Sequence, residues 1–287
     1  MTGGSVSVLM WIGSRGIDVS PDVKAEYLFS ESYVLYLHAL GGRELNDYRR
    51  LNAFSPYWSL NARMPSTYVP LNATLGFKAS PVNGLWFNVF GGYRISKDEL
   101  FCNLVDADGY YFTHFLQDKA KTAYGGAELK YGYKDWFDAS LKGTFYSWKT
   151  DNENEELYLV TKPKFELNFY AEAKVFEGLK VNLGYEYVQR KEYVIEEGNS
   201  SKDFGLGNIS NLSVGASYTF LKDLSVFGRV NNLLNKQYYY EYGYPAEIHY
   251  ANKYMYQNLL LEENPPLNTT TVHFIYTECL HPVGLIH

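Results

Sequence analysis

The sequence contains two long runs of alternating apolar and polar residues, 165–175 and 179–187, joined by the turn Phe176-Glu177-Gly178. Side chains of a β-strand point to alternate faces, so each run predicts a strand with one apolar and one polar face. Each arm of this hairpin is about a dozen residues long, whereas a typical strand of a soluble protein has roughly 5–6 residues. A tilted strand needs roughly 9–11 residues to cross a bilayer, so this hairpin is long enough to do so.

The composition favours membrane-crossing strands over membrane-crossing helices. Aromatic residues make up 17% of the chain and include 28 tyrosines, which excludes a disordered protein. Mean hydropathy is −0.30, and no stretch approaches the roughly 20 consecutive apolar residues of a membrane-spanning helix. Neither observation argues against a membrane barrel, because a barrel strand presents only every second residue to lipid.

Charge and cysteine content exclude further classes of protein. The formal net charge is −6 and the basic residues are scattered, so we expect no nucleic-acid partner. Cys102 and Cys279 lie far apart and match no metal-ligand spacing, which indicates neither a disulfide framework nor a zinc site. The first residues lack the basic region and cleavage site of a signal peptide, so we expect an exported protein of this kind to begin further upstream.

Similar alternation recurs along most of the chain, and it is clearest at 68–79, 85–95, 122–133, 136–148 and 207–220. We expect roughly eleven strands in all, with a polar loop after residue 95 and a weak strand at 110–115. Short turns fall near residues 31, 82, 134, 177 and 222, and longer polar connections separate them. Short turns at one end and long loops at the other are typical of an up-and-down outer-membrane barrel.

Alternation alone does not say which face meets lipid, because a soluble β-sandwich would bury the same apolar row as its core. Strand length and turn asymmetry favour the barrel, as do aromatic residues near the strand ends, among them Tyr131, Tyr133 and Trp148. Trp86 and Trp136 fall in the polar row and fit an aromatic belt less well. We therefore predict an all-β, antiparallel up-and-down transmembrane β-barrel, with a soluble β-sandwich as the alternative.

One segment resembles a known family. Residues 224–246 contain Asn-Asn-Leu-Leu-Asn-Lys at 231–236, then Tyr238-Tyr239 and Gly243-Tyr244-Pro245. This run is similar to the penultimate strand and last long loop of TonB-dependent outer-membrane receptors. Residues 71–95 also look like the barrel hairpins of that family, and the resemblance covers about residues 5–247.

The resemblance implies a C-terminal part of such a barrel. The family fold is a barrel of about 22 strands around an N-terminal plug. This sequence holds roughly half of those strands, and no segment of it resembles the plug or the motif that contacts TonB. The implied fold is thus an incomplete, roughly half barrel in the cell outer membrane, surrounded by lipid. TonB would act only through a plug domain missing from this chain, and a surface lipoprotein is a possible further partner.

The implied function is active uptake of a scarce nutrient, namely a siderophore, a cobalamin or an oligosaccharide. A passive porin-like or structural barrel and a soluble β-sandwich binding module remain alternatives. Two regions are expected: residues 1–247 form the barrel-like part, and residues 248–287 form an atypical tail in which the two-residue period is lost. We interpret this tail as the product of a shifted reading frame or a rearranged gene end.

Catalytic and metal chemistry are not expected. Asp106-Ala107-Asp108-Gly109 lacks the later ligands of a calcium loop, and the six histidines have no ligand spacing. The carboxylates Glu166, Glu172 and Glu186 alternate with lysines on the polar row, which is typical of balanced charges inside a lumen. We therefore predict a protein that is not an enzyme and carries no metal or cofactor.

Candidate ligand-binding residues come from the long polar and aromatic loop at 41–67. Arg49, Arg50, Tyr57 and Trp58 combine cations with aromatic rings. Rings stack on sugars or ring systems, and arginine pairs with acidic groups. The loop therefore predicts an outer binding surface, and an ordinary exposed loop is the alternative.

Overall fold

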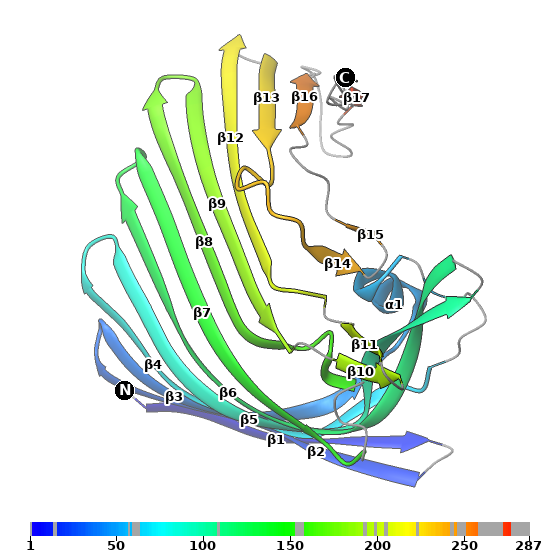
Figure 1. Ribbon diagram of the computed structural model, residues 1–287. Helices are drawn as coiled ribbons and strands as arrows, with labels where there is room; N and C mark the ends of the chain where they lie inside the picture. Colours follow the sequence, from blue (N-terminus) through cyan, green and yellow to red (C-terminus); the bar gives the residue numbers. More distant parts are fainter. Residues whose placement is uncertain are drawn as a thin grey trace.

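The computed structural model describes residues 2–13, 16–56, 58, 64–107, 110–152, 158–191, 194–197, 200–203, 206–221, 224–241, 244–245, 251–257 and 272–276. Within these ranges, thirteen antiparallel strands form one sheet in chain order. Figure 1 shows them curling side by side into an open, trough-shaped wall. The strands are β1 (Thr2–Gly13), β2 (Gly16–Ser30), β3 (Tyr33–Glu44), β4 (Thr67–Val82), β5 (Leu85–Ala107), β6 (Tyr110–Tyr133), β7 (Phe137–Thr150), β8 (Pro163–Phe176), β9 (Leu179–Arg190), β12 (Ile209–Leu221), β13 (Leu224–Val230), β16 (Ala251–Gln257) and β17 (Val272–Tyr276).

The two ends of the sheet differ. Tight turns join β4 to β5 and β8 to β9, where Gly84 and Gly178 have φ of +83° and +86°. Glycine adopts this left-handed conformation without a steric penalty. The opposite end, here called the loop end, carries α1 (Tyr48–Phe54) and the hairpins β10–β11 (Val194–Glu197, Ser200–Asp203) and β14–β15 (Tyr239–Glu241, Tyr244–Pro245) (Figure 1). This asymmetry and the strand order confirm the predicted up-and-down arrangement.

The predicted strand number is also confirmed. In the part of the chain that the structure describes, eleven strands (β1–β9, β12 and β13) account for the sheet up to Val230. β16 then pairs with β13 along its whole length, and β17 pairs with β16. The predicted boundary at residue 247 falls before β16, and the foreign origin of residues 248–287 stays a prediction.

The polar loop predicted after residue 95 is instead part of a long hairpin. β5 continues to Ala107, β6 begins at Tyr110, and the two strands pair on both sides of an irregularity between Ser96 and Glu99. Asp98 lies within this irregularity and has a φ of +55°. A bulge of this kind accommodates extra polar residues without ending the pairing, which is why the polar composition was misleading here.

The apolar row of the strands forms a large exposed surface. Leu75 and Val89 are 54% and 53% exposed, and Leu129 is 43% exposed. The polar row lies on the hollowed side, where Glu128, Lys142 and other polar residues line a concavity. A β-sandwich would cover the apolar row with a second sheet. The other sheets among the described residues are two-stranded hairpins, so the structure does not support the sandwich alternative.

Candidate ligand-binding site

The helix α1 folds inward against the loop end of β5 and β6. Asp47 caps its start by accepting a hydrogen bond from the Arg50 backbone N–H (2.9 Å). The helix ends at Ser55, whose hydroxyl lies 2.7 Å from the Thr113 hydroxyl on β6. Leu51 is 2% exposed and packs in a buried cluster with Leu100, Cys102 and Phe115. α1 is seven residues long, and no helix in the described ranges is long and apolar enough to span a membrane.

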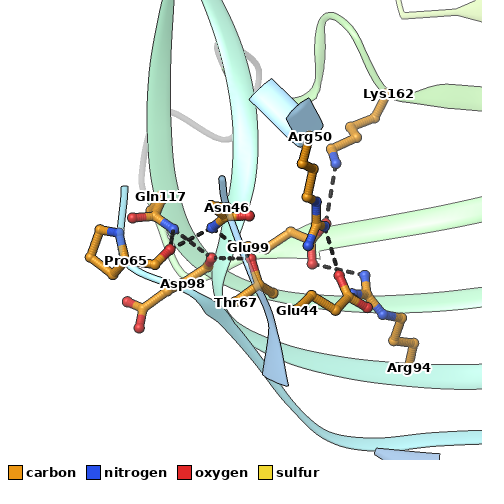
Figure 2. Close-up of polar contacts among 10 residues, drawn as sticks. All are labelled: Glu44, Asn46, Arg50, Pro65, Thr67, Arg94, Asp98, Glu99, Gln117 and Lys162. Atoms are coloured by element: carbon orange, nitrogen blue, oxygen red, sulfur yellow. Dashed lines mark hydrogen bonds and ion pairs between the residues drawn. The ribbon is translucent and has the colours of Figure 1, made fainter. Parts of the chain in front are cut away.

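A chain of five charged side chains ties α1 to the wall, as Figure 2 shows. Arg50 of α1 pairs with Glu44 at the end of β3 (2.6 Å), and Glu44 pairs with Arg94 of β5 (3.0 Å). Arg94 also contacts Glu99 (2.8 Å), and Glu99 contacts Lys162, which directly precedes β8 (3.3 Å). The chain joins parts of the sequence more than a hundred residues apart and carries one more positive than negative charge.

The Glu99–Lys162 end of this chain is buried. The side chains of Glu99 and Lys162 are 4% and 11% exposed. Burial by itself raises the pKa of Glu99, but Lys162, Arg94 and hydrogen bonds from Ser96 and Lys162 together lower the pKa below its ordinary value. For Lys162, burial lowers the pKa, and the attraction to Glu99 only partly opposes this effect. Both groups lie at the loop end, beyond the length of strand needed to cross a bilayer.

Aromatic rings surround the Lys162 ammonium. Its Nζ lies 4.8 Å from the ring centre of Trp148, 4.9 Å from that of Phe101 and 5.9 Å from that of Phe54. These distances are within the range of cation–π attraction, which gains strength when the site is desolvated. The Trp148 indole N–H donates to the Pro163 carbonyl (3.0 Å), which fixes that ring against the start of β8.

A second set of polar residues holds the α1 loop, the segment between β3 and β4 that contains α1, against β5 and β6 (Figure 2). Gln117 donates from its amide to the carbonyl oxygens of Pro65 (2.8 Å) and Asp98 (2.9 Å). Thr67 donates to the same Asp98 carbonyl (2.8 Å), and Asn46 donates to Thr67 (3.2 Å). Both ends of the loop are therefore anchored to β5 and β6 by buried or half-buried hydrogen bonds.

A cavity of about 310 Å³ opens beside this charge chain. Its lining comes from α1, β5, β6, β7, the start of β8 and the segment before it, the end of β9, the segment before β12, and β14. The lining residues are Phe54, Leu100, Cys102, Thr113, Tyr146, Trp148, Thr161, Lys162, Pro163, Arg190, Leu206 and Tyr240. Two cations and four aromatic rings are in this set, and no carboxylate is among the described residues that line the cavity. Such a cavity can hold a small molecule that carries negative charge and a flat apolar surface.

None of the described residues among those predicted from the sequence lines this cavity. Arg49 is exposed on α1, and Arg50 is engaged with Glu44. Trp58 packs against Tyr48 and Phe115, with ring centres 5.6 and 5.8 Å apart. Tyr57 lies outside the described residues. A ligand-binding role for Arg49, Arg50, Tyr57 and Trp58 stays a prediction.

Sequence reasoning missed the residues that line the cavity. Trp148 ends an alternating strand, and its position predicted an aromatic belt at the membrane surface rather than a contact with Lys162. Lys162 and Arg190 have no local pattern, because their neighbours come from distant strands. In the part of the chain that the structure describes, no group of three or more His, Cys, Asp or Glu residues could hold a metal ion.

The fold can be compared with solved structures. The sequence matches no protein-family model and no curated protein. The structure matches the pyoverdine outer-membrane receptor FpvA from Pseudomonas aeruginosa PAO1 with a TM-score of 0.58 and 15% identity, over 83% of this chain and 35% of that chain. The siderophore receptor PirA from Pseudomonas aeruginosa gives 0.54 and 16% over 82% and 42%, and the ferric-catecholate import receptor Fiu from E. coli K12 gives 0.53 and 14% over 82% and 34%.

The chain has the fold of part of a TonB-dependent outer-membrane receptor barrel. The described strands thus bear out the fold implied by the sequence resemblance. This chain spans between 34% and 42% of the length of the three receptors, so the shared fold is a partial barrel.

Proposed function

We propose that this chain forms part of the wall and outer loops of a TonB-dependent receptor that actively takes up a scarce nutrient across an outer membrane. The observation that carries the proposal is the single curved sheet, which is apolar on its exposed face and polar on its hollowed face. FpvA and PirA, whose structures share this partial fold, are described as receptors for pyoverdine and for siderophores. A siderophore, a cobalamin or an oligosaccharide is the proposed cargo.

The apolar face supports an outer-membrane location. The strands β7, β8 and β12 have 14, 14 and 13 residues, which exceeds the roughly 9–11 residues that a tilted strand needs to cross a bilayer. Exposed apolar residues recur along this face on neighbouring strands, as at Leu37, Leu75 and Val89. Lipid is the partner that makes such an exposed surface favourable.

The asymmetry of the sheet orients the proposed receptor. Outer-membrane barrels have short turns on the periplasmic side and longer loops on the outer side. The loop end would then face outward, and the α1 loop, the charge chain and the cavity would be the first parts that a nutrient meets. TonB would supply the drive through a plug domain, and a surface lipoprotein could deliver the cargo. In this role the chain binds and conducts its cargo and performs no catalysis.

Energy dependence tests this proposal. The gene for this chain would be deleted in its own organism, and uptake of iron-loaded siderophore, cobalamin and oligosaccharide would be measured with and without an uncoupler of the proton gradient. We expect one of these uptakes to require the gene, TonB and the gradient. Uptake that requires the gene but neither TonB nor the gradient would identify a passive barrel instead. Absence of the protein from the outer-membrane fraction would reject both functions.

A further inference from the structure

The cavity beside the charge chain has an uneven charge distribution. Lys162 and Arg190 both line it, while its described lining contains no carboxylate. Glu99 lies 3.3 Å from the Nζ of Lys162 and is outside the lining. Glu166 accepts a hydrogen bond from the Tyr146 hydroxyl (2.9 Å) and is also outside it. Among the described residues, the lining therefore presents two cations and no carboxylate to a ligand.

Both cations carry several N–H donors, and the protein holds each of them in place. An ammonium group has three N–H donors, and Lys162 uses one on Glu99. A guanidinium group has five, and the Nη2 of Arg190 donates to the Tyr239 carbonyl (2.5 Å). Arg190 is only 7% exposed, so its position is held by the surrounding protein. Hydrogen bonds from such groups to a carboxylate are short and stronger than those between neutral partners.

Aromatic rings form much of the remaining wall. Phe54, Tyr146, Trp148 and Tyr240 come from α1, β7 and β14 and line the same cavity. The Tyr240 hydroxyl donates to Glu186 (2.7 Å), which fixes the outer edge of that ring. The volume of about 310 Å³ is at the lower end of the range for small-molecule pockets, which corresponds to a ligand of one or two rings.

We propose that this cavity binds a small planar aromatic carboxylate. The ring stacks among the four aromatic side chains, and the carboxylate faces Arg190 and Lys162. This inference gives a ligand class to the receptor role proposed above and rests on that role for its biological meaning. The described lining comes from this chain, so binding is measurable without transport.

The test uses the full purified chain in detergent micelles and isothermal titration with three probes. The probes are 2-naphthoate, its uncharged analogue 2-naphthamide, and cyclohexanecarboxylate, which has the charge without the aromatic ring. We expect 2-naphthoate to bind at least about tenfold more tightly than either of the others. Equal binding of 2-naphthoate and 2-naphthamide would overturn the inference, because it would show partition into apolar surface alone.

Substitutions locate the site. Arg190→Gln removes a lining cation, and Tyr240→Leu removes a ring that is 46% exposed and therefore of little weight for folding. Each is expected to weaken 2-naphthoate binding at least about tenfold. Lys119→Gln removes an exposed cation outside the lining and is expected to leave binding unchanged. Loss of binding with Arg49→Gln and no change with Tyr240→Leu would overturn the inference, because it would place the ligand on the outer loop instead.

The two proposals fail separately. Absence of 2-naphthoate binding together with TonB-dependent uptake of a nutrient would overturn the ligand class and leave the receptor role standing. Binding of 2-naphthoate that is sensitive to Arg190→Gln, together with uptake that needs neither TonB nor the proton gradient, would leave the site standing and overturn the receptor role.

Discussion

Replacing Glu99 with glutamine tests the charge chain directly. Glu99 is 4% exposed as a side chain and is shared by Arg94 (2.8 Å) and Lys162 (3.3 Å). Glutamine keeps the size of the side chain but removes its charge, so the buried Lys162 loses the carboxylate that pairs with it among the described residues. Breaking a buried ion pair from one side costs about 3–5 kcal/mol. Arg94 keeps Glu44 as a partner at 3.0 Å, so we expect the lower limit, about 3 kcal/mol.

We expect this loss of stability to be local, in the segment that ends at Lys162 just before β8. About 3 kcal/mol corresponds to a more than roughly 100-fold increase in the opening equilibrium of the segment around residues 158–162. Amide hydrogen exchange of the chain in detergent micelles measures this quantity. Glu177→Gln, in the exposed turn between β8 and β9, is the matched control and should change protection by less than about 0.5 kcal/mol.

A second substitution separates loss of the ion pair from loss of packing. Lys162→Met removes the buried charge and leaves a flexible apolar side chain among Phe54, Phe101 and Trp148. In the double variant Glu99→Gln/Lys162→Met, no uncompensated ammonium remains, so about 2 kcal/mol of the loss should return. If the double variant opens as readily as Glu99→Gln alone, the ion pair is not what holds this segment.

The remaining predictions concern pH, the sheet and a turn. Because the pKa of Glu99 is lowered from 4.5, its stabilisation is complete above 4.5 and is lost as the pH falls through the lowered value, so Glu99→Gln should flatten that part of the pH profile of hydrogen exchange. A Cβ at Gly76 would lie 2.3 Å from the Tyr36 ring, so Gly76→Ala should cost about 1–3 kcal/mol in thermal unfolding, whereas Gly228→Ala, with open space at that point, should not clash. Asn232→Gly should cost about 1–3 kcal/mol because it removes side-chain hydrogen bonds to both the Lys236 N–H (3.2 Å) and carbonyl (3.0 Å). Asn235→Gly, at an exposed position with the same φ of +51°, should be nearly neutral in the same unfolding experiment.

Most of the sheet was predictable because its signal is local. The two-residue alternation of 165–175 and 179–187 became β8 and β9, which pair from Pro163 and Arg190 down to the turn at Phe176 and Leu179. Alternation within one segment is enough to predict a strand, and a short turn after it predicts that the next strand pairs with it. The hairpin of β5 and β6 was harder to predict, since its polar residues sit at a bulge whose existence depends on the partner strand.

The candidate site was not predictable in the same way. The sequence drew attention to Arg49, Arg50, Tyr57 and Trp58 because they cluster within one loop. In the structure, Trp58 packs on Phe115 and Arg50 pairs with Glu44, so their described contacts hold the loop in place. The cavity draws instead on residues from 54 to 240. Only the register of the strands brings such residues together, and register is not visible in any single segment.

Lys162 belongs to both the charge chain and the cavity lining, so a change at one of these features affects the other. Its ammonium contacts Glu99, and Lys162 is also part of the cavity lining. A carboxylate ligand in the cavity would therefore add a second negative partner to a cation that burial makes costly to charge. Such a ligand would favour the charged form of Lys162, and by linkage it would stabilise the arrangement in which α1, β5 and the start of β8 are held together. Binding of such a ligand would thus be coupled to the packing of the α1 loop through one side chain.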